Sequence, residues 1–577
     1  MMNRSRTSSR TSATFLRRGG AACVCLALVL PAWGSAPAVH GGDDVLPIQW
    51  DRRAVEHVWN RAGFGIHEDE IDRWVEAGPE ALVDHLLAPR PLVGPGGELQ
   101  ELLPSFEFEP TRIDLLDYEQ RSLEQRREFR RIAARENAAA FQGLRTRWIE
   151  QIASGDDPLR DRMCMFWHGV FTSSYRTVRH PSPMIEQHNA LRAGALGSYD
   201  ALLRAMLRDV ALLQYLDGDK NRKGRPNENL AREVMELFSL GEGNYTEADI
   251  GEAARALTGA GVATRFDGGW YRFFAKRHDA GEKSILGVTG HHRPDDLPDI
   301  LLAQPACARF IASSIIEYLE GAAPTDERTE RYAEVLRATG YDVGFMLRQL
   351  LLDPAFYRDE IIGARITSPV DYLMGMSVRL GDQLPPNFVV QAASELGEDL
   401  FQPPNVKGWE SGLHWMTTAR FMLRGNIAGA ALGLISGEGL RSDALGFVDE
   451  MSMEEGMEDM SSGDAMAMGV EQLRRDELAQ LVRALESAKY QPSFSFVRAV
   501  RGDGAQTDAE IVESMAASLL AIEPPVETLR MLEGRLFQLR RREGLAAKRL
   551  TQSRSLAEPV LRELGHLILS LPEAQLH

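Results

Sequence analysis

Apolar side chains recur at helical spacing along most of the chain. Residues 191–216 give the clearest case, with apolar positions at Leu191, Ala195, Leu196, Tyr199, Leu202, Leu203, Met206, Val210 and Leu213. Similar patterns cover 67–88, 112–153, 306–320, 325–338, 343–352, 365–380 and 526–550. Gly340 and Gly381 stand where two of these helices would end. The pattern predicts a mainly α fold, a multi-helix globular body.

One region departs from this pattern. Residues 262–287 contain Thr264-Arg-Phe266, the glycine-rich Asp267-Gly-Gly269, and the aromatic run Trp270-Tyr-Arg-Phe-Phe274. Aromatic and β-branched residues on either side of a glycine-rich turn are typical of paired strands. We therefore expect a small β-hairpin or meander within the helical body.

The N-terminus has the pattern of a secretory signal peptide over residues 1–38. Five arginines and no acid occupy residues 1–18, an apolar run follows from Ala21 to Leu30, and Ala36-Pro-Ala38 suits a signal peptidase. An uncleaved membrane anchor is the alternative. No later run approaches the roughly eighteen apolar residues of a membrane span. We expect an exported protein, periplasmic, cell-envelope or extracellular, with no transmembrane segment after signal removal.

Residues 446–470 differ in composition from the rest of the chain. They are acidic and carry six methionines, Met451, Met453, Met457, Met460, Met466 and Met468. This composition is typical of a disordered linker or insertion, which would separate a main helical domain (45–445) from a C-terminal helical segment (471–577). The thioethers could also bind Cu(I), although incidental methionines in a linker are the preferred interpretation.

Charge and cysteine content restrict the possible partners and chemistry. The formal net charge is −18, and a strongly acidic surface repels phosphate backbones, so we expect no nucleic-acid partner. Of the four cysteines, Cys164 and Cys307 lie outside the signal segment. They could form one disulfide in an oxidising compartment or remain two buried thiols. No cysteine cluster with metal-ligand spacing is present.

The segment Pro226–Gly241 carries closely spaced charges on a predicted helix that Pro226 and Asn227 begin and Gly241 ends. Glu228 and Arg232 are four residues apart, as are Arg232 and Glu236, while Glu233 and Glu236 are three apart. These charges alternate with apolar residues. They are either buried pairs that fix packing, which we prefer, or a catalytic or metal site.

The loop before this helix has the spacing of a calcium loop. Asp217, Asp219, Asn221 and Glu228 fall at positions 1, 3, 5 and 12, with Lys223 at position 7. Arg222 stands at position 6, where such loops need glycine, and Pro226 interrupts the run. A divalent cation, calcium, is one hypothesis, and a polar turn is the alternative.

Three histidines are further candidates. His168 ends the apolar run that begins at Met163, His188 lies in a polar stretch, and His278 precedes Asp279. A histidine beside an aspartate, with Lys283 five residues on from His278, could form an acid–base group with an electrophilic partner. Ordinary packed or surface histidines are the alternative.

Several of these motifs resemble the bacterial domain of unknown function 1800 family. The resemblance rests on Asn60-Arg-Ala-Gly-Phe-Gly65, Phe166-Trp-His168, Phe171-Thr-Ser173, Tyr215-Leu-Asp-Gly218, Asn227–Gly241, Asn244–Asp249, Ala254–Gly259, Arg277–Gly281, Ser368-Pro-Val370, Pro403–Trp409 and Ser570–Leu576. It implies an exported, largely helical protein without an established activity. It also implies a partner, since members are commonly paired in genomes with a second exported family of alkaline-phosphatase-like character.

Two functional hypotheses follow. In the first, the fold gathers the ionisable groups into one polar cleft of a hydrolase that acts on an envelope or extracellular polymer by Glu/His acid–base chemistry. Its candidate residues are His168, His188, Arg232, Glu233, Glu236, His278 and Asp279. In the second, the chain is a non-catalytic binding or assembly protein that acts with an exported partner.

Overall fold

The computed structural model describes residues 47–88, 120–263, 268–381, 383–435, 464–545, 550 and 554–577. The predicted signal peptide (1–38) and residues 446–463 of the methionine-rich segment lie outside these ranges. Residues Val45–His577 form one compact unit. The description below concerns that unit alone.

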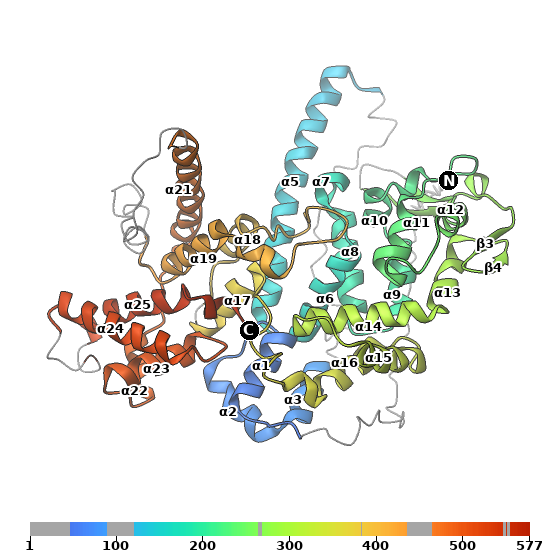
Figure 1. Ribbon diagram of the computed structural model, residues 1–577. Coiled ribbons are helices and arrows are strands. Elements are labelled where there is room, and N and C mark those ends of the chain that lie inside the picture. The colour runs from blue at the N-terminus through green and yellow to red at the C-terminus, as the bar shows by residue number, and fades with distance from the viewer. Residues whose placement is uncertain are drawn as a thin grey trace, which may run out of the picture. The chain divides into compact units, whose positions relative to one another are not determined.

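The prediction of a mainly α fold is confirmed (Figure 1). The first half of the unit contains α1 (Arg52–Ala62), α2 (Glu68–Ala77), α3 (Pro79–Leu87), α5 (Leu123–Ser154), α6 (Pro158–Val170), α7 (Tyr175–Val178), α8 (Pro181–Gly194), α9 (Tyr199–Met206), α10 (Val210–Tyr215), α11 (Asn229–Glu233) and α12 (Glu247–Ala256). The second half contains α13 (Leu297–Leu302), α14 (Pro305–Glu320), α15 (Asp326–Ala338), α16 (Val343–Leu351), α17 (Pro369–Arg379), α18 (Pro386–Glu395), α19 (Thr418–Ala431), α21 (Asp464–Ser487), α22 (Phe496–Gly502), α23 (Asp508–Leu519), α24 (Val526–Arg542) and α25 (Arg554–Leu569).

Several predicted helical stretches differ from the observed helices, and two of them bear on the candidate site. The run over 191–216 is divided into the end of α8, α9 and α10, because Gly197 and Asp209 lie at breaks and the Asp209 carboxylate accepts the Leu212 backbone N–H at 2.7 Å to begin α10. The helix predicted from Pro226 begins at Asn229 and continues from Val234 to Leu240 as a π-helix. Gly241 ends it as predicted, with φ 75° and ψ 163°.

The predicted β region is confirmed as two small antiparallel pairs. Strand β1 (Ala260–Ala263) pairs with β2 (Trp270–Phe273), and β3 (Lys283–Ile285) pairs with β4 (Val288–Gly290). Residues 264–267, which include the predicted strand Thr264–Phe266, lie outside the described ranges. Helix α12 packs against β3, which attaches the strands to the helical body.

Buried apolar side chains form two clusters. The first holds residues of α1–α3, α6 and α8–α16, among them Val58, Trp167 and Ile315. The second holds residues of α5, α17–α19 and α21–α25, among them Trp148 and Leu564. The C-terminal helices therefore share a core with α17 and α18, and Figure 1 shows them beside each other.

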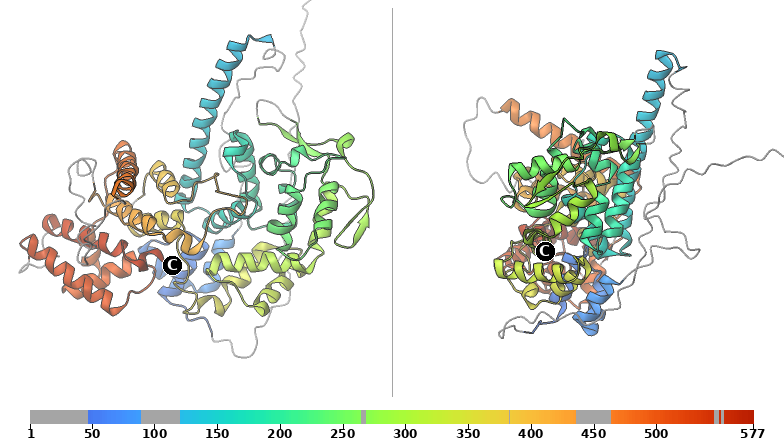
Figure 2. Two further views of the ribbon diagram at one scale, coloured as in Figure 1. Left: turned by 45° about the horizontal axis from the view of Figure 1, so that its top comes forward. Right: turned by 90° about the vertical axis from the view of Figure 1, so that its right-hand side faces the viewer.

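Helix α5 is buried only in its C-terminal half. Its buried residues begin at Ala140, whereas Leu123 and Ile132 are exposed. A capping box between Ser122 and Gln125 begins the helix, and Gly155 in a left-handed conformation ends it. Figure 2 shows its N-terminal half extending beyond the neighbouring helices in both views.

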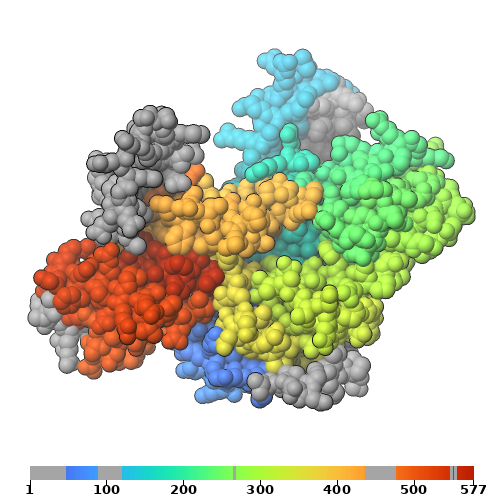
Figure 3. All heavy atoms as spheres, in the orientation of Figure 1, coloured from blue at the N-terminus to red at the C-terminus, as the bar shows by residue number. Residues whose placement is uncertain are grey.

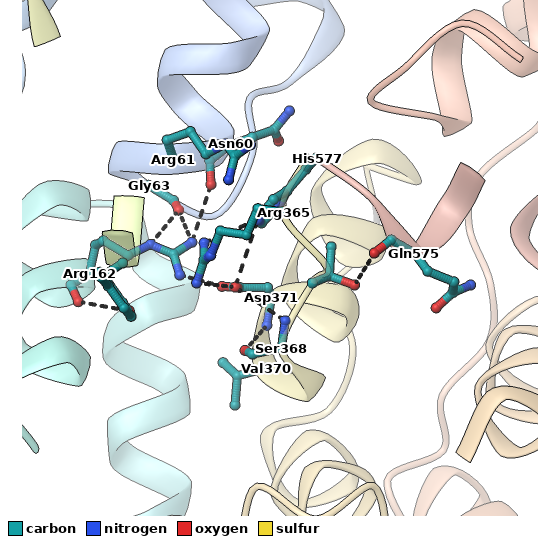
Figure 4. A network of polar contacts seen from close by, with 12 residues as sticks. Asn60, Arg61, Gly63, Arg162, Arg365, Ser368, Val370, Asp371, Gln575 and His577 are labelled. Atoms are coloured by element: carbon teal, nitrogen blue, oxygen red, sulfur yellow. Dashed lines mark hydrogen bonds and ion pairs between the residues drawn. The ribbon is translucent and has the colours of Figure 1, made fainter. Parts of the chain in front are cut away.

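A buried polar network joins the two clusters (Figure 4). The Asp371 carboxylate on α17 accepts from Arg162 on α6 and pairs with Arg365 at 3.1 Å. The Arg162 guanidinium also donates to the Gly63 carbonyl at 3.1 Å, and Nε2 of His577 lies 4.0 Å from Asp371. Burial alone would raise the pKa of Asp371, but Arg162 and Arg365 outweigh it and hold that pKa below its usual value.

Within the described ranges, no single helix is both long and apolar enough to cross a bilayer. The bent pair Pro294–Leu302 and Pro305–Glu320 meets that length and composition only when the two helices are taken together.

Candidate functional site

The sequence-predicted site residues lie in three separate groups. The first is His168 on α6 and His188 on α8, with His168 Nε2 3.1 Å from His188 Nδ1. Both are buried against the Trp148 ring, whose centroid is 4.6 Å from that of His168 and 4.8 Å from that of His188. Burial lowers the pKa of His168 to about 3 and that of His188 well below its usual value, so both rings are neutral at physiological pH.

The thiol of Cys164 belongs to this first group. It lies one helical turn before His168 on α6, and its Sγ is 3.9 Å from His188 Nδ1. Burial raises the pKa of the thiol, which is therefore protonated. Cys164 and Cys307 are both free and buried, which settles the choice between a bridge and two thiols in favour of thiols.

The second group surrounds the π-helix. Both Nη atoms of Arg232 donate to Glu247 of α12, at 2.8 and 2.7 Å, and Arg232 lies 3.6 Å from Glu228. Glu236 accepts from the Tyr245 hydroxyl at 2.9 Å. Burial and the neighbouring Glu236 raise the pKa of Glu233. Arg232 does form ion pairs, but the preferred interpretation of buried pairs is wrong for it, because its side chain is 35% and that of Glu247 76% exposed. Its main partner is Glu247 rather than Glu236.

The third group contains His278 and Asp279. His278 Nδ1 lies 2.8 Å from the Thr258 carbonyl and must donate to it, which leaves Nε2 as the ring's acceptor. Asp279 pairs with Arg255 at 2.8 Å, and this hydrogen bond helps lower its pKa to about 2. Lys283 donates to the carbonyls of Asp279 and Gly281 at 2.6 and 2.9 Å, so its ammonium is already engaged.

The second and third groups contact opposite ends of α12. Arg232 binds Glu247 at the first residue of this helix, and Asp279 binds Arg255 near its last residue. Eight residues of helical rise separate Glu247 from Arg255, about 12 Å. Among the described residues, no hydrogen bond or ion pair joins any of the three groups to another. The structure therefore does not gather these residues into one site.

The candidate calcium ligands also have other partners. Asp217 pairs with Lys220, and its φ of 56° places it in the left-handed region. Asn221 is buried, donates to the Ala254 carbonyl at 2.8 Å and accepts the Asn227 backbone N–H at 3.0 Å. In the part of the chain that the structure describes, Asp217, Asp219 and Glu228 do not converge on a common point. The Asn221 side chain thus fixes the loop rather than facing a cation.

Sequence reasoning missed a cationic surface beside this loop. It consists of the exposed residues Arg222, Lys223, Arg225, Arg272, Lys276 and Arg277, called here the cationic surface. The Lys223 backbone N–H donates to the Arg277 carbonyl at 2.7 Å, which joins the two segments. Arg272 and Arg277 both lie over the Phe274 ring, at 5.3 and 4.3 Å from its centroid. The sequence feature that could have revealed this surface is the pair of short basic runs at 222–225 and 272–277 in an otherwise acidic chain.

An open hollow of about 450 Å³ lies in this surface. Its lining includes Lys220, Arg222, Arg225 and Asn227, with Glu228 contributing the one acid. Residues 217–290 occupy the stretch coloured green in Figure 3, at the edge of that face and away from the C-terminal helices. The hollow and its surroundings can accommodate an anionic ligand.

Comparison with known proteins identifies one similarity. Residues 57–576 match the family described as "Protein of unknown function (DUF1800)". No curated protein and no solved structure matches the chain.

Proposed function

The chain belongs to the DUF1800 family, and we propose that it is an exported binding protein whose cationic surface holds an acidic polysaccharide of the envelope or extracellular space. The observation that carries the proposal is a group of six exposed cations without counter-ions. None of the six has an ion pair or a side-chain hydrogen bond with the residues that the structure describes.

Other exposed arginines of this chain do have such partners. Arg53 pairs with Asp359 at 2.6 Å, Arg208 with Asp295 at 2.7 Å and Arg309 with Glu330 at 2.5 Å. In a chain with a net charge of −18, carboxylates are abundant enough to pair with most exposed cations. A cluster left without them keeps its positive potential for an external anion.

The composition of the surface favours a polymer over a protein partner. Stable protein interfaces have an apolar, aromatic-rich centre that is depleted of charge. Here the exposed side chains are guanidinium and ammonium groups on the loop 222–225 and on the segment 272–277, which includes the end of β2, and the Phe274 ring lies among them as a platform for two arginines. Charges spaced along these two adjoining segments suit the repeated carboxylates or sulfates of a linear polysaccharide. The predicted signal peptide would direct the protein to the envelope or extracellular space, where such polysaccharides lie.

The test compares two triple variants that remove equal charge. The first neutralises the loop by Arg222→Gln, Lys223→Gln and Arg225→Gln. The control neutralises three exposed but paired arginines by Arg53→Gln, Arg208→Gln and Arg309→Gln. At about 1 kcal/mol per cation near an anionic surface, the loop variant should bind heparin, dextran sulfate or alginate about 100-fold more weakly. Binding should also weaken with salt.

Three outcomes would overturn the proposal. One is equal weakening by the control variant, which would show that only overall charge matters. Another is equal binding to uncharged dextran. The third is preferential binding to duplex DNA at the same salt concentration, which would assign the surface to nucleic acid.

A second candidate function rests on His278. Its Nδ1–H is fixed on the Thr258 carbonyl, and burial, reinforced by Lys283 and Arg293, lowers its pKa, so Nε2 carries a free lone pair at neutral pH. It directly follows Arg277 of the cationic surface. This arrangement would suit a base acting on a bound polymer, as in the hydrolase hypothesis. His278→Gln should then abolish release of shorter chains and retain binding, whereas unchanged release would exclude this role.

A further inference from the structure

The buried pair His168 and His188 forms, with Cys164, a feature that polysaccharide binding does not explain. Cys164 and His168 are four residues apart on α6 and share one face of that helix. His188 comes from α8, which packs against α6. One ligand atom from each residue lies within 4.8 Å of the other two. In the described part of the chain, this is the one group of three or more Cys, His, Asp or Glu residues that converges in this way.

We propose that Cys164, His168 and His188 form a buried copper site that takes a single Cu(I) ion. The donor set of one thiol and two imidazoles is typical of copper and zinc ligands. With metal–nitrogen bonds of about 2.0 Å and a metal–sulfur bond of about 2.3 Å, a planar three-coordinate ion needs ligand separations of about 3.5 and 3.7 Å. The observed separations are 3.1 Å between the nitrogens, 3.9 Å from sulfur to His188 and within 4.8 Å from sulfur to His168. The thiol and the His168 ring must therefore approach each other by up to about 1 Å.

Charge and coordination number favour monovalent copper over zinc. Cys164 and His188 are fully buried and His168 is 4% exposed. Trp148 and Phe401 cover the rings, with centroids 4.6 Å (Trp148) and 5.3 Å (Phe401) from that of His168. Cu(I) and one thiolate together are neutral, whereas Zn²⁺ would leave one uncompensated positive charge in an apolar enclosure. A buried structural zinc ion also takes four protein ligands, and three are present.

The surrounding charges leave this balance intact. Asp161, Arg192 and Arg160 lie close enough to influence Cys164. Asp161 pairs with Arg192 at 2.6 Å, and Arg160 pairs with Asp157 at 2.7 Å. Both histidines are neutral, as metal ligands must be. Binding converts the thiol to a thiolate, so one proton passes to solvent for each ion bound, and the oxidation state of copper is unchanged.

A purely structural role accounts poorly for the cluster. His188 Nδ1 meets His168 Nε2 at 3.1 Å, and that is the only hydrogen bond shorter than 3.9 Å between members of the cluster. The Cys164 thiol has only a 3.9 Å contact with the same ring. An apolar residue at either position would avoid the desolvation of groups that are so sparsely hydrogen-bonded. Bonds from the thiol and the two imidazoles to a metal ion would offset this desolvation and stabilise the three side chains in their buried positions.

The experiment uses the full chain produced in copper-supplemented cultures, because a buried site is expected to load during folding. Copper retained after dialysis should equal one ion per chain, and X-ray absorption should report one sulfur and two nitrogen neighbours. Cys164→Ser and His188→Gln should each weaken Cu(I) binding by more than about 100-fold, beyond the effect typical of outer-shell changes. Cys307→Ser is the matched control, since Cys307 is also a free, buried cysteine, and should retain the ion.

Each alternative result is decisive. Copper retention unchanged by Cys164→Ser, in a variant with the wild-type circular dichroism spectrum, would overturn the proposal. Preferential retention of zinc would do the same. Deletion of residues 450–469 distinguishes the methionine-rich segment, because loss of the retained ion in that variant would place the copper there. The X-ray absorption measurement needs no variant and therefore stands even if a substituted chain fails to fold.

Discussion

Replacing Asp371 by asparagine tests whether the buried network in Figure 4 stabilises the fold. The Asp371 side chain is 1% exposed and is the carboxylate for two guanidiniums, Arg162 and Arg365. Asparagine keeps the shape of Asp371 and removes its charge, which leaves both guanidiniums without a carboxylate, although Arg162 keeps the Gly63 carbonyl and Arg365 keeps His577 Nε2. A third arginine, Arg61, is buried nearby. Burial lowers its pKa, and the positive charges of Arg365 and Arg162 lower it further, so the region is already rich in positive charge.

Removing one partner of a buried ion pair typically costs about 3–5 kcal/mol. The unfolding entropy is about 2.1 cal/mol/K per residue. If residues 45–577 unfold as one cooperative unit, a loss of about 1 kcal/mol in unfolding free energy lowers Tm by about 1 °C. Asp371→Asn should therefore lower Tm by about 3–5 °C. Asp295→Asn is the control, because its pair with Arg208 is on the surface and should contribute less than about 1 kcal/mol. Equal shifts in calorimetry for the two variants would refute the reasoning.

Three further predictions concern pH, metal and backbone. Burial, with Asp371 nearby, raises the pKa of Glu398 from 4.5 to about 7, so the native state holds a proton that the unfolded chain releases. The stability that this carboxyl contributes is lost as pH rises from 5 to 7, so the Tm of Glu398→Gln relative to that of the wild type should rise over this range, and a constant difference would contradict this. Chelation of calcium should leave Tm unchanged, because the Asn221 side chain is engaged with backbone groups, and a drop would revive the calcium loop. Gly241→Ala should lower the unfolding free energy measured in urea by about 1–3 kcal/mol, since φ is 75° and a Cβ would lie 2.9 Å from the Phe310 side chain. Gly224→Ala is the control, because Gly224 is also at positive φ but has open space around it, and it should lower the unfolding free energy less. The reverse order would exclude the Phe310 contact as the cause.

The sequence was informative where local rules determine structure. Helical periodicity located α14–α17 and α24 among others but not α1, α12, α18 or α25. Gly241 ended its helix as expected because glycine tolerates the conformation there. The pairing of Arg232 was less predictable. A π-helix from Val234 displaces Glu236 from the face that regular spacing assigns to it, and Arg232 instead reaches Glu247 on α12.

The sequence pattern does not predict which residues from different helices come into contact, because such contacts depend on how the helices pack. The four-residue spacing of Cys164 and His168 is visible in the sequence, but His188 joins them only through the packing of α8 on α6. A single polar cleft was expected because ionisable residues clustered in three sequence segments. The ionisable residues of each segment instead contact residues close to that segment, as Asp279 pairs with Arg255. A charge paired in this way gains little from contact with the other two groups.

The two proposed sites are expected to act independently, and helix α10 provides the reason. It packs against α8, which carries His188, and against β1 and the turn Gly218–Lys220, which adjoin the cationic surface. Coupling between the sites would require this helix to have two arrangements. Yet Val210, Ala211, Leu212 and Leu213 are all buried, and Asp209 caps the first turn, so any displacement would disrupt the core around it. Copper-loaded and copper-free protein should therefore bind heparin with equal affinity. A difference above about fivefold, which is the lower range of allosteric coupling, would show that α10 moves.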